Sequence, residues 1–327
     1  AVDCPFFLPW SAWRQPDSAC ASAAKNATDT KRINTKMNTH LTGIIPALLT
    51  PFGGDGGVNT DALKRVIDWN IEKGVDGFYV GGSTAEAFLL SEEERNLVYR
   101  TAAEAAGGRV PLIAHVGCIS TEQAIRFAKV AERLGYTAIS AIAPFYYKFS
   151  FEQIKRHYFA IADAVSLPMV IYNFPNFSGV NLTVEQVAEF FADDRFIGIK
   201  HTSNDFFSLE QFKSRFPEKL VFNGFDEMLL SGLAVGADGG IGSTYNFMAE
   251  KYIALYRAFR AGNMGEALKI QQACNRIIRA LCRVGVMEGE KEVLCQLGFD
   301  FGEARSPFSS LTAEQKDFLR KEITEQL

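Results

Sequence analysis

The sequence lacks the features that would make metals, disulfide bonds or membranes central to its structure. Its six cysteines form no Cys-x-x-Cys pair, so we expect neither a zinc site nor a disulfide framework. The four histidines are scattered without the spacing of metal ligands, and we predict no bound metal. No apolar run approaches the roughly 18 residues that would span a bilayer, so we expect no membrane partner.

An excess of charge of one sign is also missing. The chain has 34 Lys and Arg against 38 Asp and Glu, a formal net charge of −4 over 327 residues. A protein without an excess of positive charge attracts polyanions poorly, and we expect no nucleic acid partner. Free thiols within helical or strand-like segments are typical of a reducing compartment, which predicts a cytoplasmic location.

Residues 1–36 differ from the rest of the chain. Residues 1–13 contain an apolar patch without the preceding basic residues of a secretory signal, and residues 18–36 are polar and show no periodic pattern. Such a composition buries too little apolar surface to fold, so we predict a disordered extension that is dispensable. Met37 stands just before the first strand-like run, which suggests a natural start there and a foreign segment upstream. A weak organelle-targeting peptide is the alternative, because basic residues outnumber acidic ones in this segment.

From residue 41 onward, short apolar runs alternate with segments of helical periodicity. Eight runs have the continuous apolar character of strands buried on both faces: residues 43–50, 77–80, 112–117, 138–144, 169–173, 196–200, 220–224 and 239–243. The helical segments open at candidate caps such as Asn59 and Ser120 and close at glycines such as Gly74 and Gly135. Eight such units in about 220 residues predict a closed α/β barrel, the (β/α)8 or TIM barrel, over residues 37–263.

A doubly wound open sheet is the alternative fold, but no Gly-x-Gly-x-x-Gly motif follows the first strand-like run. The strand-like runs stop before Gly262. Residues 264–327 have the pattern of three helices interrupted at Gly285 and Gly298. We therefore predict a C-terminal three-helix appendage that packs on the barrel or on another subunit.

In such a barrel the active site lies at the C-terminal ends of the strands, where this chain is unusually polar. Lys200 closes the buried run FIGIK, and burial favours its neutral amine, a nucleophile toward carbonyl carbon. The structural alternative is a lysine that reaches solvent or pairs with Asp226 or Glu227. Because side chains alternate along a strand, Lys200 shares a face with Thr202, while His201 points into the packing layer.

Residues 81–84, GGST, follow another strand-like run and precede a helix-like pattern. Free backbone N–H groups, two hydroxyls and the positive end of a helix dipole would together suit a carboxylate or a phosphate. The alternative is a tight turn in which Ser83 or Thr84 only caps the helix.

Three further polar residues follow strands of the predicted barrel. Tyr172 ends the strand beside that of Lys200, where a phenol either transfers protons or only packs. Asp226 and Glu227 open a helix, where carboxylates suit hydroxyl binding and helix capping equally well. The positions of these three residues in the sequence do not decide between a chemical and a structural role.

A set of motifs between about residue 41 and about residue 295 carries a family resemblance. The motifs are YVGGSTAEAF, LIAHVGC, PFYYKFSFE, YNFP, IGIKHTS, NGFDE and GADGGIGSTYN, in order and with compatible spacing. They resemble the dihydrodipicolinate synthase and N-acetylneuraminate lyase family of pyruvate-dependent class I aldolases. The resemblance implies catalysis through a lysine Schiff base without metal or organic cofactor, commonly in a homotetramer.

The resemblance also implies roles for individual residues. Lys200 would form the imine, Tyr172 would act as acid and base, and Tyr146 would assist from near a subunit boundary. The GGST loop would hold the pyruvyl carboxylate through Ser83 and Thr84. The other pocket residues, which would line the sugar-like part of the substrate, are Thr202, Gly224, Asp226, Glu227 and Ser243.

Within this family the motifs favour the lyase branch. Dihydrodipicolinate synthases usually carry an arginine shortly after the YNxP tyrosine, where this chain has Asn176, Phe177 and Ser178. We expect reversible aldol cleavage of N-acetylneuraminate into pyruvate and N-acetylmannosamine. The alternatives are another aldolase of the family, either dihydrodipicolinate synthase-like or specific for 2-keto-3-deoxy sugar acids, and a barrel that binds keto acids without catalysis.

Ala85 departs from the family pattern, which reads GGSTGE where this chain reads GGSTAE. If the backbone needs a positive φ or a very close approach there, the methyl group disturbs the carboxylate loop. If Ala85 instead has helical φ and ψ, alanine stabilises the turn. Because carboxylate-binding loops commonly depend on glycine, we expect a compromised site.

Overall fold

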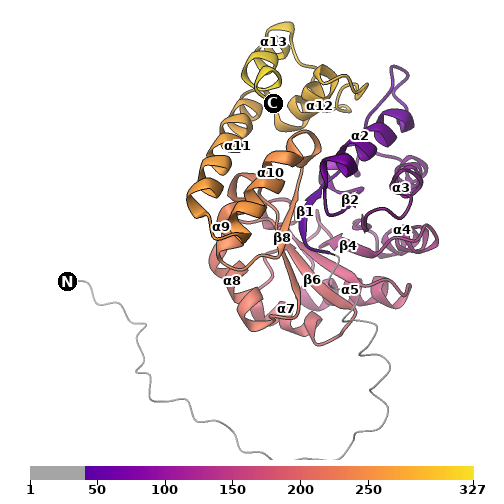
Figure 1. Ribbon diagram of the computed structural model, residues 1–327. Coiled ribbons are helices and arrows are strands. Elements are labelled where there is room, and N and C mark those ends of the chain that lie inside the picture. The colour runs from indigo at the N-terminus through magenta and orange to yellow at the C-terminus, as the bar shows by residue number, and fades with distance from the viewer. Residues whose placement is uncertain (1–40) are drawn as a thin grey trace, which may run out of the picture. The chain divides into compact units, whose positions relative to one another are not determined.

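In a computed structural model of the chain, the described residues, 41–327, form a barrel of eight parallel strands (Figure 1). The strands are β1 (Gly43–Pro46), β2 (Phe78–Val80), β3 (Leu112–His115), β4 (Ala138–Ile142), β5 (Met169–Asn173), β6 (Phe196–His201), β7 (Leu220–Asn223) and β8 (Gly239–Gly242). They are hydrogen-bonded in the order β1-β8-β7-β6-β5-β4-β3-β2. A parallel bridge between Ala47 and Tyr79 joins the ends, and Leu48 N–H donates to the Tyr79 carbonyl at 2.9 Å. The predicted TIM barrel is confirmed.

Every residue of the eight strands is buried, which explains why the apolar runs do not alternate with polar residues. One set of side chains fills the barrel interior and includes Ile45, Tyr79, Ile113, Val170, Phe222 and Ile241. The opposite set packs under the helices and includes Ile44, Ile199 and Val221. An interior side chain near the C-terminal end of a strand therefore lies at the mouth of the barrel.

Helices cover the outside of the barrel. They are α2 (Thr60–Lys73), α3 (Glu92–Ala106), α4 (Thr121–Arg133), α5 (Phe151–Asp163), α6 (Pro175–Ser178), α7 (Val184–Phe191), α8 (Phe206–Arg215), α9 (Leu229–Ala234) and α10 (Tyr245–Arg260). The predicted caps are present, since Asn59 accepts the Ala62 N–H at 3.1 Å and Ser120 accepts that of Gln123 at 3.4 Å. Gly74 ends α2 with φ of 89°.

The segment after α10 contains the three expected helices, α11 (Met264–Val284), α12 (Val286–Gln296) and α13 (Ala313–Glu322), and a last turn, η5 (Thr324–Gln326). Figure 1 shows α11 beside α10, and α12 reaches the barrel. There the Lys291 ammonium pairs with Glu86 at 2.6 Å, with both side chains fully buried. Arg305 donates to Glu94 of α3 at 2.7 Å. The C-terminal helices therefore pack on the barrel of the same chain, one of the two surfaces that we predicted for them.

The predictions for residues 1–36 and for Met37 lie outside the residues that the structure describes. Within residues 41–327, no helix is long and apolar enough to cross a membrane. No group of three metal-binding side chains occurs in the same range. The four cysteines described there, Cys118, Cys274, Cys282 and Cys295, are free thiols.

Candidate active site

Lys200 lies near the C-terminal end of β6, opposite Tyr172 of β5 in the sheet register. Its Nζ lies 4.4 Å from the centroid of the Tyr172 ring and 4.6 Å from that of Tyr79. Burial lowers the pKa of the amine to about 7, although the Asp226 carboxylate offsets part of this shift. A large fraction of the amine is therefore neutral near pH 7 and can act as a nucleophile.

The structural alternatives for Lys200 are not observed. The residue is 5% exposed, so it does not reach solvent. None of the lysine ion pairs within residues 41–327 involves Lys200. As the alternation along β6 predicts, His201 points the other way, with its ring 5.4 Å from that of Phe212 in α8.

Tyr172 is buried beside two hydroxyl side chains. Burial raises the pKa of its phenol, and the neighbouring Thr202 and Ser83 hydroxyls offset part of the rise. Apart from this contact with the Tyr172 phenol, Ser83 Oγ and Thr202 Oγ1 are buried with no hydrogen-bond partner within the described residues. Buried polar atoms without partners are rare in folded proteins, so these two hydroxyls are suited to bind a ligand.

The GGST loop has the tight geometry that its glycines suggest. Gly81 has φ of 74°, and a Cβ there would lie 2.6 Å from the Tyr99 ring. Ser83 begins a short 3-10 turn, η3 (Ser83–Ala85), whose first N–H groups have no partner within the turn. The loop therefore offers both backbone and hydroxyl donors to an anion.

The predicted helix after this loop begins later than expected. α3 starts at Glu92, and Ser91 caps it by accepting the Glu94 N–H at 3.2 Å. Neither Ser83 nor Thr84 caps a helix, because Gly82 precedes η3 without a side-chain cap. The helix-dipole contribution to anion binding is therefore absent here, while the N–H and hydroxyl contributions remain.

Ala85 does not have a positive φ, which was one of the two conditions under which its methyl group would disturb the loop. It lies in η3 and is fully buried, and its carbonyl accepts the Thr50 hydroxyl at 2.8 Å. The positive φ, 55°, falls on Glu86 instead. The buried pair with Lys291 and the Arg305 N–H, at 2.6 Å, hold Glu86 in place. The premise of a positive φ at Ala85 is therefore wrong.

We consequently expect Ala85→Gly to leave the kinetics within about twofold of the wild type and to lower stability by up to about 1 kcal/mol. Glycine gains backbone freedom in the unfolded chain and loses the packing of one buried methyl group. Thermal unfolding and steady-state kinetics on the purified variant test this. A clearly lower Michaelis constant would show that the methyl group does obstruct the loop.

Asp226 lies in the turn η4 (Asp226–Met228), after β7, and its carboxylate is largely engaged within the protein. Its Oδ2 accepts the Thr244 N–H at 2.8 Å and the Thr244 hydroxyl at 2.6 Å. Burial raises the pKa of Asp226 to about 6. Gly224 lets the backbone approach the Thr202 hydroxyl closely, because a Cβ at this position would lie 1.9 Å from Thr202 Oγ1.

Glu227 and Ser243 complete the polar groups at this side of the barrel mouth. Glu227 is partly buried, and its carbonyl accepts Asn275 Nδ2 of α11 at 3.0 Å. The Ser243 hydroxyl, just after β8, donates to Glu290 Oε1 of α12 at 2.6 Å. Helices α11 and α12 therefore form hydrogen bonds with residues of the candidate site.

Tyr146 is not gathered with these residues within one chain. It is 84% exposed and has φ of 76°, and its ring packs on that of Tyr147 at 5.0 Å. Its assignment to the site therefore stays a prediction that involves a second subunit.

Three residues of this region were missed by sequence reasoning. Tyr79 forms one wall beside Lys200, and its position in an apolar strand was the only signal for it. The buried Arg95 guanidinium donates to the carbonyls of His115 and Gly81 and so holds the GGST loop from below. Glu290 lies in a helix that sequence reasoning treated as an appendage.

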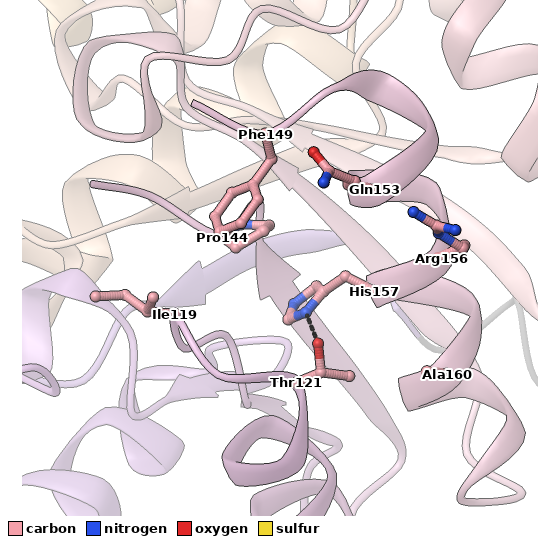
Figure 2. A pocket seen from close by; sticks show the side chains of 8 residues that line it. All are labelled: Ile119, Thr121, Pro144, Phe149, Gln153, Arg156, His157 and Ala160. Atoms are coloured by element: carbon pink, nitrogen blue, oxygen red, sulfur yellow. Dashed lines mark hydrogen bonds between the residues drawn. The ribbon is translucent and has the colours of Figure 1, made fainter. Parts of the chain in front are cut away.

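A cavity of about 370 Å³ lies elsewhere, where α4 and α5 begin (Figure 2). His157 faces it and shares a hydrogen bond of 2.8 Å with Thr121. Its lining comprises Ile119, Thr121, Pro144, Phe149, Gln153, Arg156, His157 and Ala160, none of them among the predicted site residues.

The structure defines the class of protein as a TIM barrel with a buried lysine near the C-terminal ends of its strands. Comparison with known proteins identifies the family. Residues 40–326 match the model of the Dihydrodipicolinate synthetase family. The match covers most of the chain, and the chain belongs to this family.

Several relatives within the family are N-acetylneuraminate lyases or sialic acid aldolases. The N-acetylneuraminate lyase of Rhizobium meliloti is 44% identical over 283 residues, 86% of this chain and 94% of that protein. The solved N-acetylneuraminate lyase of Fusobacterium nucleatum has a TM-score of 0.84 and 39% identity, covering 88% of this chain and 99% of its own. A catalytic lysine mutant of the Ruminococcus gnavus sialic acid aldolase has a TM-score of 0.84 and 34% identity, covering 86% and 94%.

Proposed function

We propose that this chain catalyses the reversible aldol cleavage of N-acetylneuraminate to pyruvate and N-acetylmannosamine, through a Schiff base on Lys200. One observation carries the proposal: a buried lysine with a pKa of about 7 stands between two tyrosine rings at the mouth of a barrel. The names of the relatives supply the substrate. The N-acetylneuraminate lyases of Rhizobium meliloti and Fusobacterium nucleatum align over most of this chain.

In the proposed reaction the Lys200 amine attacks C2 of the keto acid, and water leaves to form an iminium ion. The C3–C4 bond then breaks, and its electron pair moves to the iminium nitrogen as an enamine forms. The C4 hydroxyl loses its proton in the same step, which releases the sugar aldehyde. Protonation of the enamine at C3 and hydrolysis of the imine then release pyruvate and regenerate the amine.

Tyr172 is proposed to transfer protons in these steps. Its raised pKa keeps the phenol neutral, so it donates a proton to the departing hydroxide as the imine forms. That transfer leaves a phenolate beside the iminium cation. In the cleavage step the phenolate accepts the C4 hydroxyl proton, which returns Tyr172 to its neutral form.

The sugar-like part of the substrate is assigned to the side of the mouth with Asp226, Glu227 and Ser243. Carboxylate oxygens accept hydrogen bonds from hydroxyl groups, so these acids suit a polyol. A substrate with a second carboxylate would be repelled there. The residues after Tyr172, within α6, include no arginine to neutralise such a group. These features favour the lyase over a dihydrodipicolinate synthase.

The proposal includes a homotetramer in the cytoplasm, with Tyr146 assisting a neighbouring subunit. The exposure of Tyr146 and of Tyr147, 84% and 63%, supports a contact surface at this loop. We expect light scattering to give the mass of four chains. A monomeric protein with full activity would exclude the assisting role of Tyr146.

A pyruvate-release assay with N-acetylneuraminate tests the proposed function directly. We expect release of pyruvate and N-acetylmannosamine in equal amounts. Borohydride reduction in the presence of pyruvate separates the alternatives. An adduct without cleavage of N-acetylneuraminate would indicate another aldolase of the family, and the absence of an adduct would indicate a barrel that only binds.

A further inference from the structure

Glu290 is a buried carboxyl group of α12 that contacts the candidate site. It is 0% exposed, and its Oε1 accepts the Ser243 hydroxyl at 2.6 Å across 47 residues of sequence. Its Oε2 is also buried and has no hydrogen-bond partner within residues 41–327. Half of this carboxyl group is therefore unsatisfied by the protein.

No cation compensates Glu290 in the described part of the chain. The adjacent Lys291 is directed elsewhere, with its ammonium 2.6 Å from the Glu86 carboxylate and 3.9 Å from the centroid of the Phe52 ring. A buried carboxyl group without a counterion is unfavourable for folding. Protein stability therefore does not explain a glutamate at this position.

The charges around Glu290 make its burial less favourable still. Burial raises its pKa to about 8, the Asp226 carboxylate adds to the rise, and the Ser243 hydroxyl opposes it. From α11, Cys282 lies within electrostatic range of both Glu290 and Glu227. All of these neighbours are acidic or neutral.

The contact with Glu290 decides how Ser243 can meet a substrate. A serine hydroxyl has one hydrogen to donate and two lone pairs to accept. With the hydrogen directed to Glu290 Oε1, both lone pairs of Ser243 Oγ are available to accept from a ligand. Without Glu290 the hydroxyl would rotate freely, and its hydrogen could point toward a substrate hydroxyl.

We propose that Glu290 is a positioning residue for the sugar-like half of the substrate, because it fixes Ser243 as a hydrogen-bond acceptor for a substrate hydroxyl. The inference rests on the proposed function and adds a residue of the C-terminal helices to the site. The acceptor matches Asp226 and Glu227, whose carboxylates are proposed to accept from substrate hydroxyls as well. The site would thereby favour a polyol over a substrate that presents acceptors.

Two substitutions separate positioning from a structural role. Glu290→Leu removes the acceptor and the buried carboxyl group, so we expect the KM for N-acetylneuraminate to rise by about tenfold, the effect of one hydrogen bond. We expect kcat to stay within about threefold and Tm to stay equal or to rise. Glu290→Gln keeps an oxygen that accepts from Ser243, so its KM should stay within about threefold of the wild type.

Borohydride trapping of pyruvate should be unchanged in both variants, since pyruvate lacks the sugar-like half. Glu292→Gln is the matched control on the same helix, because Glu292 faces Lys316 at 3.4 Å rather than Ser243. We expect its KM and trapping to match the wild type.

A double substitution tests whether Glu290 acts through Ser243. The KM of the Glu290→Leu, Ser243→Ala variant should be no higher than that of Ser243→Ala, since coupled residues are not additive. The proposal would be overturned if the two substitutions raised the KM independently, so that their fold-changes multiplied in the double variant. It would also be overturned if Glu290→Leu kept the wild-type KM, or if Glu290→Leu and Glu290→Gln raised the KM equally. If the wild-type protein itself neither traps pyruvate nor cleaves N-acetylneuraminate, the proposed function fails instead.

Discussion

Replacing Lys200 with alanine is expected to abolish both borohydride trapping of pyruvate and cleavage of N-acetylneuraminate, by more than about 10³-fold. Lys200 Nζ is the only protein atom that forms a covalent bond with the substrate in the proposed reaction. No water or neighbouring side chain replaces an amine in iminium formation. Mass spectrometry of the reduced protein measures trapping, and pyruvate release measures cleavage.

Lys219→Met is the matched control for this prediction. Lys219 is also buried, at 6% exposure, and burial also lowers its pKa. Its ammonium, however, donates to the Phe196 carbonyl at 2.8 Å, at the N-terminal end of β6, whereas Lys200 lies near the C-terminal end of the same strand. We expect Lys219→Met to retain trapping. An adduct that persists in Lys200→Ala would assign the chemistry to another lysine.

The same lysine predicts a pH dependence. Imine formation needs the neutral amine, and the pKa of Lys200 is about 7 rather than its usual value of 10.5. We therefore expect kcat/KM to rise with pH through about 7 and to level off above it. A profile that continues to rise toward pH 10 would mean that the amine is not desolvated in the free enzyme.

Tyr172→Phe is expected to lower kcat by roughly two to four powers of ten while pyruvate trapping remains possible. The substitution removes the hydroxyl beside Ser83 and Thr202. It keeps the ring, 4.4 Å from Lys200 Nζ and 5.7 Å from the Phe174 ring. Packing around the lysine should therefore be preserved, and only proton transfer is lost.

Tyr79→Phe provides the comparison for this variant. The Tyr79 ring also contacts Lys200, but its hydroxyl donates to Ser140 at 3.0 Å, within the barrel. We expect a much smaller loss of kcat than in Tyr172→Phe. Equal losses in the two variants, or near-normal turnover in Tyr172→Phe, would leave Tyr172 with a packing role.

The barrel and the position of Lys200 were predictable because they depend on local patterns. Continuous apolar runs between helical segments have few solutions other than a closed parallel sheet. A lysine that ends such a run must lie at the mouth of that sheet. The caps of α2 and α4 were readable for the same reason, since a cap is formed by residues three positions apart.

Local patterns were misleading where distant residues hold the backbone. The residues after the GGST loop looked like the start of a helix, yet a 3-10 turn forms there and α3 begins at Glu92. Lys291 and Arg305, more than 200 residues away, hold Glu86 in the left-handed conformation. That constraint places the positive φ on Glu86 and leaves Ala85 unstrained.

The sequence by itself therefore determined the fold class of this protein and the position of the candidate lysine at the mouth of the barrel. Only the tertiary structure decided that α12 closes behind the barrel and brings Glu290 to within 2.6 Å of Ser243. No spacing in the sequence signals that contact. It arises because the apolar faces of the C-terminal helices bury themselves on the barrel and carry their polar residues with them.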